Sequence, residues 1–185
     1  MVEPLDITTE RLRLRPWQDS DRAPFAAMCA DPAVMECLLP VPDRAASDAT
    51  VDRLQAGITA RGWGFWAVEL RSTQTFIGFI GIQVPGAQLP FSPCVEIGWR
   101  LAAAHWGQGY ATEGARAALA YGFERLELDE IVAFTTVHNQ RSRAVMQRLG
   151  MQADAGTFQH PAVPSGHPLQ EHVLYRLPRN RWGPA

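Results

Sequence analysis

The stretch that decides the fold runs from Cys94 to Leu119, CVEIGWRLAAAHWGQGYATEGARAAL. Apolar and polar side chains alternate over residues 95–101, which is the period of a β-strand. The segment Trp106–Ala111 interrupts this pattern with two glycines, and from Thr112 onward the apolar residues follow the spacing of a helix face. The sequence therefore predicts a strand, a glycine-bearing turn and a helix.

The turn and the start of this helix suit an anionic ligand. Gly107 and Gly109 allow a tight turn and a close approach of backbone to ligand. The first turn of a helix adds unpaired N–H groups and the positive end of the dipole. The stretch has neither the GxxxxGK[ST] of a nucleoside-triphosphate loop nor the GxGxxG of a dinucleotide site. Taken alone, these residues leave a pyrophosphate site and a plain packing turn both open.

Composition narrows the class of protein. The chain of 185 residues, 46% of them apolar, predicts a single domain over residues 1–185 with a core over about 8–178. A net charge of −2 without a basic cluster gives no footprint for nucleic acid. All 17 basic residues are arginines, so no lysine can act as nucleophile or base. No segment predicts a membrane span or a signal peptide, and a cytoplasmic protein without a membrane partner is expected.

Two further composition features bear on the site. The three cysteines are odd in number and lack CxxC spacing, which indicates reduced, structural thiols; they are Cys29, Cys37 and Cys94. The spacing of three histidines, His160, His167 and His172, matches no zinc motif, and no metal site is predicted.

The same periodicities give the order of elements along the rest of the chain. Leucine and arginine alternate over residues 8–15, which predicts one strand with a solvent-facing side, and Asp19 or Ser20 is the expected cap of the next helix. Asn139 is the expected cap of a later helix that Gly150 ends, and the last eight residues are expected to fray. Further strands are predicted over 65–70, 75–83, 130–136, from 151, and over 172–177, and helices over 22–30, 44–60, 112–126 and 140–149.

Three groups of residues then resemble one family in order and spacing. They are VEIGWRL over residues 95–101 with WGQGYATE over 106–113, NQRS over 139–142 with RLGM over 148–151, and the opening TERLRLR over 9–15. Together they resemble the Gcn5-related N-acetyltransferase (GNAT) superfamily, and specifically its RimJ/RimL-like branch. The resemblance implies an α/β (α+β) fold with a mixed, mostly antiparallel twisted sheet of six to seven strands. Helices would cover both faces, and the two central parallel strands would splay apart.

The resemblance also implies acetyl-CoA as cosubstrate, without a metal. Trp106 departs from the Arg or Gln that opens the family's general phosphate motif, which puts a side-chain phosphate contact there in doubt but leaves the backbone cradle. The pantetheine arm would pair with the strand edge near Ile97, Trp99 and Leu101, and Asn139 would hydrogen-bond to it. The pyrophosphate residues implied are Gly107, Gln108, Gly109, Tyr110, Ala111 and Thr112.

The implied activity is transfer of an acetyl group to a primary amine, either a protein N-terminus or a small molecule. Such a reaction needs a base for the ammonium proton, a donor for the leaving thiolate and N–H groups for the oxyanion. Glu96 is the candidate base, because partial burial would raise its pKa; a solvent-facing side chain or an arginine partner is the alternative. Ser142 is the candidate at the thiolate and a cofactor contact, with a helix-start hydrogen bond as its alternative role. Tyr110 and Tyr175 are weaker candidates.

The acceptor side is the least defined by sequence. The loop over residues 158–169 is expected to shape the acceptor pocket, and Trp63, Phe65 and Trp66 either line that pocket or belong to the core. A non-catalytic acyl-CoA-binding or sensing domain is the competing function, and a homodimer is possible. The identity of the amine stays open.

Overall fold

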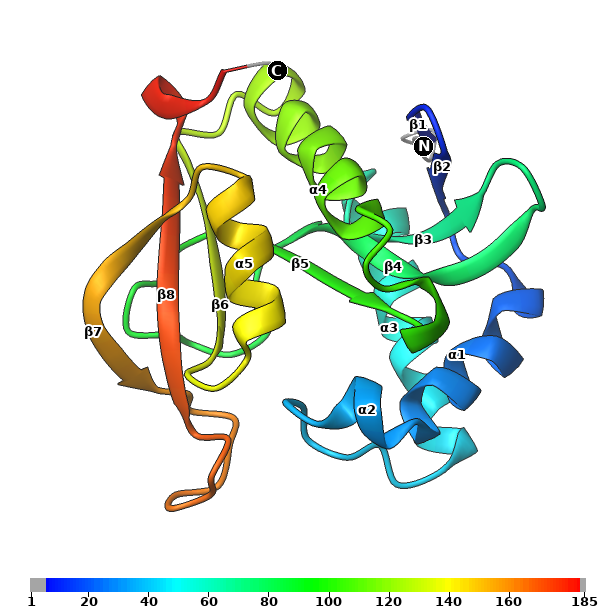
Figure 1. Cartoon of the computed structure of the whole chain (residues 1–185), viewed down its shortest axis with the longest axis horizontal. Helices are drawn as coiled ribbons and strands as arrows, with labels where there is room; N and C mark the ends of the chain where they lie inside the picture. Colours follow the sequence, from blue (N-terminus) through cyan, green and yellow to red (C-terminus); the bar gives the residue numbers. More distant parts are fainter. Residues whose placement is uncertain (1–5, 184–185) are drawn as a thin grey trace.

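A computed structural model describes residues 6–183, which form one eight-stranded sheet in the order β1-β2-β3-β4-β5-β6-β8-β7 (Figure 1). All neighbouring strands are antiparallel except β5 and β6. The predicted mixed, mostly antiparallel sheet is therefore confirmed, with eight strands in place of six to seven. The strands are β1 (Ile7–Thr8), β2 (Leu12–Arg15), β3 (Phe65–Leu70), β4 (Thr75–Gln83), β5 (Glu96–Leu101), β6 (Glu130–Thr136), β7 (Gln152–Gln159) and β8 (Glu171–Pro178).

Helices cover both faces of the sheet, as predicted. They are α1 (Arg22–Ala30), α2 (Pro32–Met35), α3 (Arg44–Arg61), α4 (Tyr110–Ala120) and α5 (Gln140–Arg148), with a π-helical segment at Tyr121–Arg125 and 3-10 turns at Asp19–Asp21, Ala103–His105 and Arg179–Arg181. Helix α4 packs on β4 and β5, whereas α1 and α3 pack on β4 and β3 from the other side. No helix within residues 6–183 combines the length and the apolar character needed to cross a bilayer.

Strand β5 divides its side chains between these two faces. Trp99 pairs with Ile80, and Ile80 lies against Gly114 of α4, so Ile97, Trp99 and Leu101 share the α4 face. Gly98 lies against the Phe65 ring, and Arg100 contacts Cys29 of α1, so Glu96, Gly98 and Arg100 share the α1 face. The sheet therefore separates a side chain on the α1 face from a ligand on the α4 face. The two can approach each other only past the open edge of β5.

That edge is open because β5 and β6 pair at a single position, Glu96 opposite Val132. The Val132 N–H donates to the Val95 carbonyl at 3.0 Å, and beyond this point the two strands diverge (Figure 1). The expected splay between the two parallel strands is confirmed. It leaves the backbone of the second half of β5 without a neighbouring strand on one side.

The N-terminal prediction is wrong in two respects. The chain over residues 8–15 is not one strand, because it turns back after β1: the Thr9 N–H donates to the Leu12 carbonyl and its hydroxyl accepts from the Leu12 N–H. Nor is one side of β2 solvent-facing along its length. Arg15 is 3% exposed, since its guanidinium is ion-paired with Asp21 and Glu69.

Helix boundaries and the C-terminus differ from expectation more modestly. Asp19 and Ser20 do not cap α1; they form a 3-10 turn before it. The expected helix over 112–126 begins earlier, at Tyr110, and ends in the π-helical segment. The frayed tail is wrong over 178–183, because the Trp182 ring stacks on Phe123 with 5.5 Å between centroids; residues 184–185 lie outside the described chain.

Candidate active site

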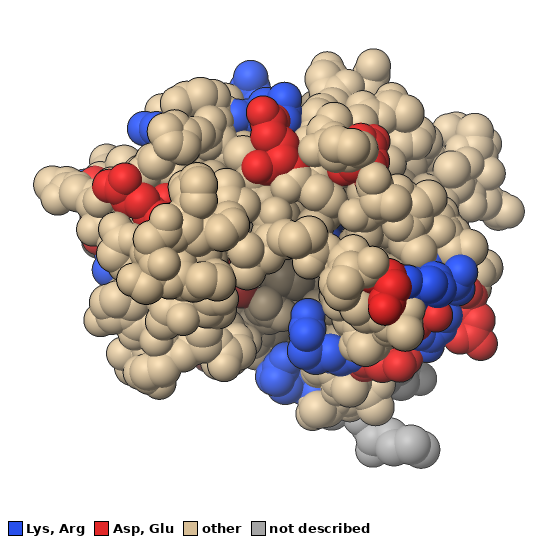
Figure 2. All heavy atoms as spheres, turned by 90° about the horizontal axis from the view of Figure 1, so that it is seen from below, with Lys and Arg blue, Asp and Glu red and all other residues tan. Residues whose placement is uncertain are grey.

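A cavity of about 1250 Å³ occupies the splay between β5 and β6 and extends over the start of α4. Strand β5, the turn before α4, helix α5 and helix α2 all contribute to its walls. Seen from below, the molecular surface is hollowed near its centre, with basic side chains beside the hollow (Figure 2). All of the predicted cofactor residues except Gln108 line this cavity.

The glycine turn provides a backbone cradle of the kind that the sequence predicts. Gly107 and Gly109 have φ of 73° and 82°, a left-handed conformation that glycine adopts without strain. No side chain caps α4, whose N-cap is Gly109, so the first N–H groups of the helix have no side-chain acceptor. An added Cβ at Gly107 would meet no atom within 4 Å, which leaves the inside of the turn open for a ligand.

Arg11 holds this turn in place from the N-terminal hairpin. Its guanidinium donates to the Gln108 carbonyl at 2.9 Å and forms an ion pair with Glu113 at 2.6 Å. Thr9 donates to the same carboxylate at 2.6 Å. These bonds lower the pKa of Glu113, against the effect of burial, and keep its carboxylate ionised near the helix start. The opening TERLRLR motif thereby has a structural role that the sequence did not reveal.

The open edge of β5 has the geometry of a strand that lacks its neighbour. Hydrogen bonds to β4 alternate along an antiparallel pair, and the Ala102 N–H donates to Ile77 in β4. Trp99 and Leu101 therefore point their backbone groups into the splay. The Leu101 carbonyl accepts from the Trp106 indole at 2.8 Å, which leaves Trp99 as the residue with its N–H and carbonyl facing the cavity. This arrangement suits an extended ligand that adds to the edge.

Across the splay, Asn139 and Ser142 come together at the start of α5. The Asn139 side-chain oxygen accepts from the Ser142 N–H at 3.2 Å, and its amide donates to the Thr135 hydroxyl at 2.9 Å. Asn139 is thus the helix cap that the sequence predicts, with its side-chain amide engaged at both ends. Ser142 lines the cavity, and its backbone N–H supplies the helix-start hydrogen bond considered as its alternative role.

Glu96 lies at the closed end of the splay, where β5 and β6 still pair, and does not itself line the cavity. Burial raises its pKa to about 7, although a hydrogen bond from Gln83 to the carboxylate opposes the rise. No arginine pairs with it among the described ion pairs. The carboxylate therefore titrates near neutral pH.

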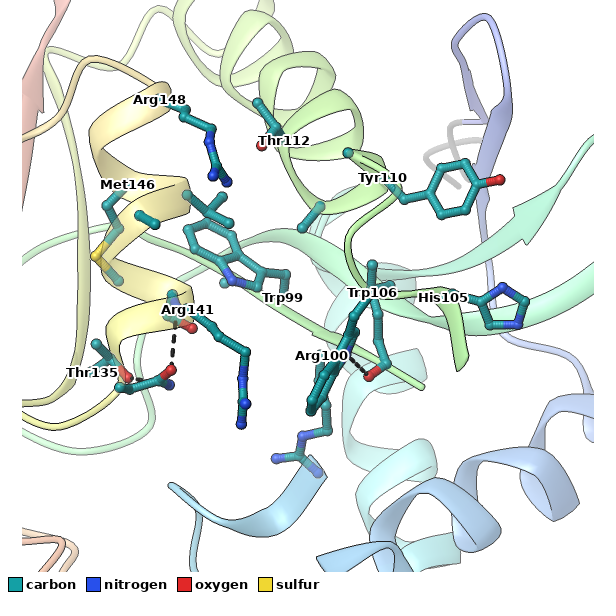
Figure 3. Close-up of a pocket in the computed structure, with 18 of the residues that line it drawn as sticks. Trp99, Arg100, His105, Trp106, Tyr110, Thr112, Thr135, Arg141, Met146 and Arg148 are labelled. Atoms are coloured by element: carbon teal, nitrogen blue, oxygen red, sulfur yellow. Dashed lines mark hydrogen bonds between the residues drawn. The ribbon is translucent and has the colours of Figure 1, made fainter. Parts of the chain in front are cut away.

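The two tyrosine candidates have other contacts. The Tyr110 ring lies under the Arg11 guanidinium, 4.7 Å from it, and points away from α5 (Figure 3). Tyr175 is buried, and its hydroxyl accepts from Arg143 at 3.4 Å. Neither tyrosine hydroxyl has a described hydrogen bond to Ser142, and the contacts of both rings favour packing roles.

The aromatic residues expected near the acceptor lie away from the cavity. Phe65 and Trp66 are buried in the core, Trp63 lies beside Arg61, and none of the three lines the cavity. The loop over 158–169 reaches the cavity only indirectly. The ring centroids of His160 and His172 are 4.8 Å apart, and both rings contact Phe134, which lines the cavity. Within residues 6–183, no three His, Cys, Asp or Glu side chains lie together in a way that could hold a metal ion.

Sequence reasoning missed the arginines of the cavity wall. Arg141 lies over the Trp106 ring at 4.4 Å and is ion-paired with Glu36 at 2.6 Å, so it joins α5 to the segment after α2 (Figure 3). Arg116 donates to the Arg148 carbonyl, and both side chains line the cavity near the start of α4. Arg100 lines the α1 side.

Comparison with known proteins assigns this fold and cavity to a class. A family described as the acetyltransferase (GNAT) domain matches residues 11–152. The chain therefore belongs to the GNAT acetyltransferase family and is an acyltransferase, which confirms the family resemblance drawn from the motifs. Members of this family use acetyl-CoA as cosubstrate.

Three relatives illustrate the range of similarity. The uncharacterized protein YkkB of Bacillus subtilis is 35% identical over 146 residues, which cover 78% of this chain and 84% of that protein. The FsC-acetyl coenzyme A-N(2)-transacetylase of Aspergillus fumigatus is 30% identical over 181 residues, covering 94% and 76%. A crystal structure of an acetyltransferase from Agrobacterium tumefaciens superimposes with a TM-score of 0.75 at 30% identity and covers 94% of both chains.

Proposed function

We propose that this protein transfers the acetyl group of acetyl-CoA to a primary amine, with Glu96 as the general base. The observation that carries the proposal is a carboxylate with a pKa raised to about 7 at the closed end of a splay whose other end is a phosphate cradle. A base poised near neutral pH suits removal of an ammonium proton. The same features do not favour a sensing domain, which would have no use for such a base.

The described residues fit acetyl-CoA in three places. The left-handed turn at Gly107 and Gly109 and the uncapped helix start would hold the pyrophosphate, with Arg116 and Arg148 nearby for phosphate charge. The Trp99 carbonyl would accept a hydrogen bond from a pantetheine amide. The cosubstrate supplies the activated acyl group, and the chain supplies its alignment between β5 and α5.

The chain's own groups then divide the proton transfers. Glu96 would take a proton from the amine, directly or through one water, since it directly precedes the cavity residue Ile97 in β5. The Trp99 N–H is the donor best placed for negative charge on the acyl oxygen. The Ser142 hydroxyl, on the opposite wall, would orient the sulfur and relay a proton to it.

The acceptor amine and the branch of the family form part of the same proposal. The opening TERLRLR motif and the tryptophan before the glycine turn support the RimJ/RimL-like branch. One relative that spans most of the chain is named an N(2)-transacetylase, which supports acetyl transfer to a nitrogen atom of the acceptor.

The testing experiment measures thiol release from acetyl-CoA with a panel of small amines, amino acids and N-terminal peptides. We expect acetyl-CoA-dependent turnover with at least one amine, and a higher melting temperature with acetyl-CoA than with ATP. Glu96→Gln should remove turnover and leave the shift by acetyl-CoA intact. Binding of acetyl-CoA without turnover on any amine would favour the sensing domain.

A further inference from the structure

Arg100 is a half-buried cation without an anionic partner. Its guanidinium donates only to the Cys29 thiol, at 3.5 Å, and lies 5.4 Å from the Phe79 ring centroid and 6.0 Å from that of Phe25. Its Nε is fully buried and has no hydrogen-bond acceptor. Within residues 6–183 no carboxylate lies within ion-pair distance of it. Aromatic faces and a thiol compensate a guanidinium poorly for lost water.

Arg15 shows what a compensated buried arginine looks like in the same protein. Its guanidinium is bound by two carboxylates, Asp21 at 2.7 Å and Glu69 at 2.9 Å, and also donates to the Pro16 carbonyl. The pKa of Arg15 is raised by these partners, whereas burial lowers the pKa of Arg100. The charge of Arg15 is therefore compensated by two carboxylates, whereas the guanidinium of Arg100 keeps N–H donors that have no acceptor.

The Arg100 side chain borders the cavity rather than a closed core. Arg100 lines the cavity together with Ala33, Val34 and Leu38 from the region of α2, and its guanidinium extends toward this side (Figure 3). The phosphate cradle belongs to the other face of the sheet, next to α4. An anion at Arg100 would therefore come from the acceptor and not from the pyrophosphate of the cosubstrate.

We propose that Arg100 recognises an anionic group on the acceptor, so that the substrates are amines that also carry a carboxylate or a phosphate. This inference rests on the proposed function, since it assumes that the amine lies near Glu96. Glu96 and Arg100 are four residues apart on one face of β5, a Cα separation of roughly 13 Å. The amine and the anion should therefore be several bonds apart, as in a short peptide with a free C-terminus.

The planar fork of an arginine matches a carboxylate in a bidentate arrangement, and a phosphate provides a similar pair of oxygens. The first test therefore uses matched acceptors with the wild-type protein: a dipeptide, its C-terminal amide, and an aminoalkyl phosphate beside the corresponding aminoalkyl alcohol. We expect kcat/KM to be about ten- to a hundredfold higher for the anionic member of at least one pair. The pair that shows the preference identifies the anion.

The second test removes the charge. Arg100→Gln should abolish the preference by raising KM for the anionic acceptor far more than KM for its neutral counterpart; Arg100→Lys should restore part of the preference. Arg44→Gln serves as control, because Arg44 is an exposed arginine paired with Asp48. Equal use of anionic and neutral acceptors by the wild type would overturn the inference even though turnover supports the proposed function.

A stability measurement separates recognition from a structural role without using activity. Arg100→Met should leave the melting temperature unchanged or raise it, since it removes a half-buried charge that has no anionic partner, whereas Arg15→Met should lower it sharply. The dipeptide should raise the melting temperature of the wild type and not that of Arg100→Met. A loss of stability in Arg100→Met comparable to that in Arg15→Met would show that Arg100 is structural and would overturn the inference.

Discussion

Gln83 donates a hydrogen bond to the Glu96 carboxylate at 2.6 Å, from the residue directly opposite on the neighbouring antiparallel strand. The bond favours the ionised carboxylate, whereas burial favours the protonated form and has the larger effect on the pKa. The balance leaves Glu96 with a pKa of about 7, so that both protonation states are populated at neutral pH.

Replacing Glu96 with glutamine should lower kcat by about 10²- to 10⁴-fold, the usual range for loss of a positioned base. Acetyl-CoA binding should be unaffected, since Glu96 does not line the cavity. Thiol release measures the first quantity and calorimetric titration with CoA the second. Glu124→Gln, at an exposed glutamate, is the matched control and should behave as the wild type. Full activity in Glu96→Gln would exclude the base assigned here.

The pH dependence of kcat/KM follows from the same carboxylate. Because the base must be ionised, the rate should rise with pH through about 7. Gln83→Met removes a bond that favours the ionised form, so the midpoint should move upward by about one to two pH units, with activity recovering at high pH. A downward shift, or an unchanged midpoint in Gln83→Met, would contradict a role of Gln83 in setting this pKa.

Glu96 should also make stability depend on pH. Its pKa is raised from 4.5 to about 7 in the folded protein, so ionisation costs the folded state free energy. The free energy of unfolding should therefore fall as pH rises through this window, by at most about 3 kcal/mol. Glu96→Gln should flatten this part of the pH profile and be more stable than the wild type at pH 8, but not at pH 4. Chemical denaturation at both pH values measures the difference.

Gly109→Ala should weaken the phosphate cradle. A side chain at φ of 82° is strained by about 1–2 kcal/mol, and relief of the strain would turn the N–H groups at the start of α4 away from the ligand. We expect CoA affinity to fall at least tenfold in a calorimetric titration. Gly86→Ala is the control, since an added Cβ at Gly86 meets nothing within 4 Å and its φ is not in the left-handed range. Equal affinities in the two variants would exclude the cradle.

The fold was predictable where the signal is local. The alternation over β5, the glycine turn before α4 and the Asn139 cap of α5 lie within short stretches, and the structure has each of them. Features that depend on distant partners were not predictable. Trp182 packs against Phe123, and the buried position of Arg15 depends on Glu69, 54 residues away in the chain.

The candidate site was predictable to a similar extent. Short motifs located the cavity walls, because a turn and two strand edges are local structures. The partner of Glu96 was not predictable, since Gln83 is opposite it only through the register of β4 and β5. The isolation of Arg100 was hidden for the same reason: whether a half-buried cation has a partner depends on the whole fold and not on its neighbours in the sequence.

The single bridge between β5 and β6 has a mechanical consequence. On one side of it lie five strands and on the other side three, and backbone pairing between the two groups is limited to that one position. A ligand that pairs with Trp99 would add hydrogen bonds beside the β5–β6 bridge. The sheet would then be more rigid with the ligand bound than without it. The Trp99 amide should then exchange with deuterium quickly in the free protein and slowly in the complex. Because the cosubstrate binds and is consumed in each cycle, the relative motion of the two groups of strands would be restricted and then restored once per turnover.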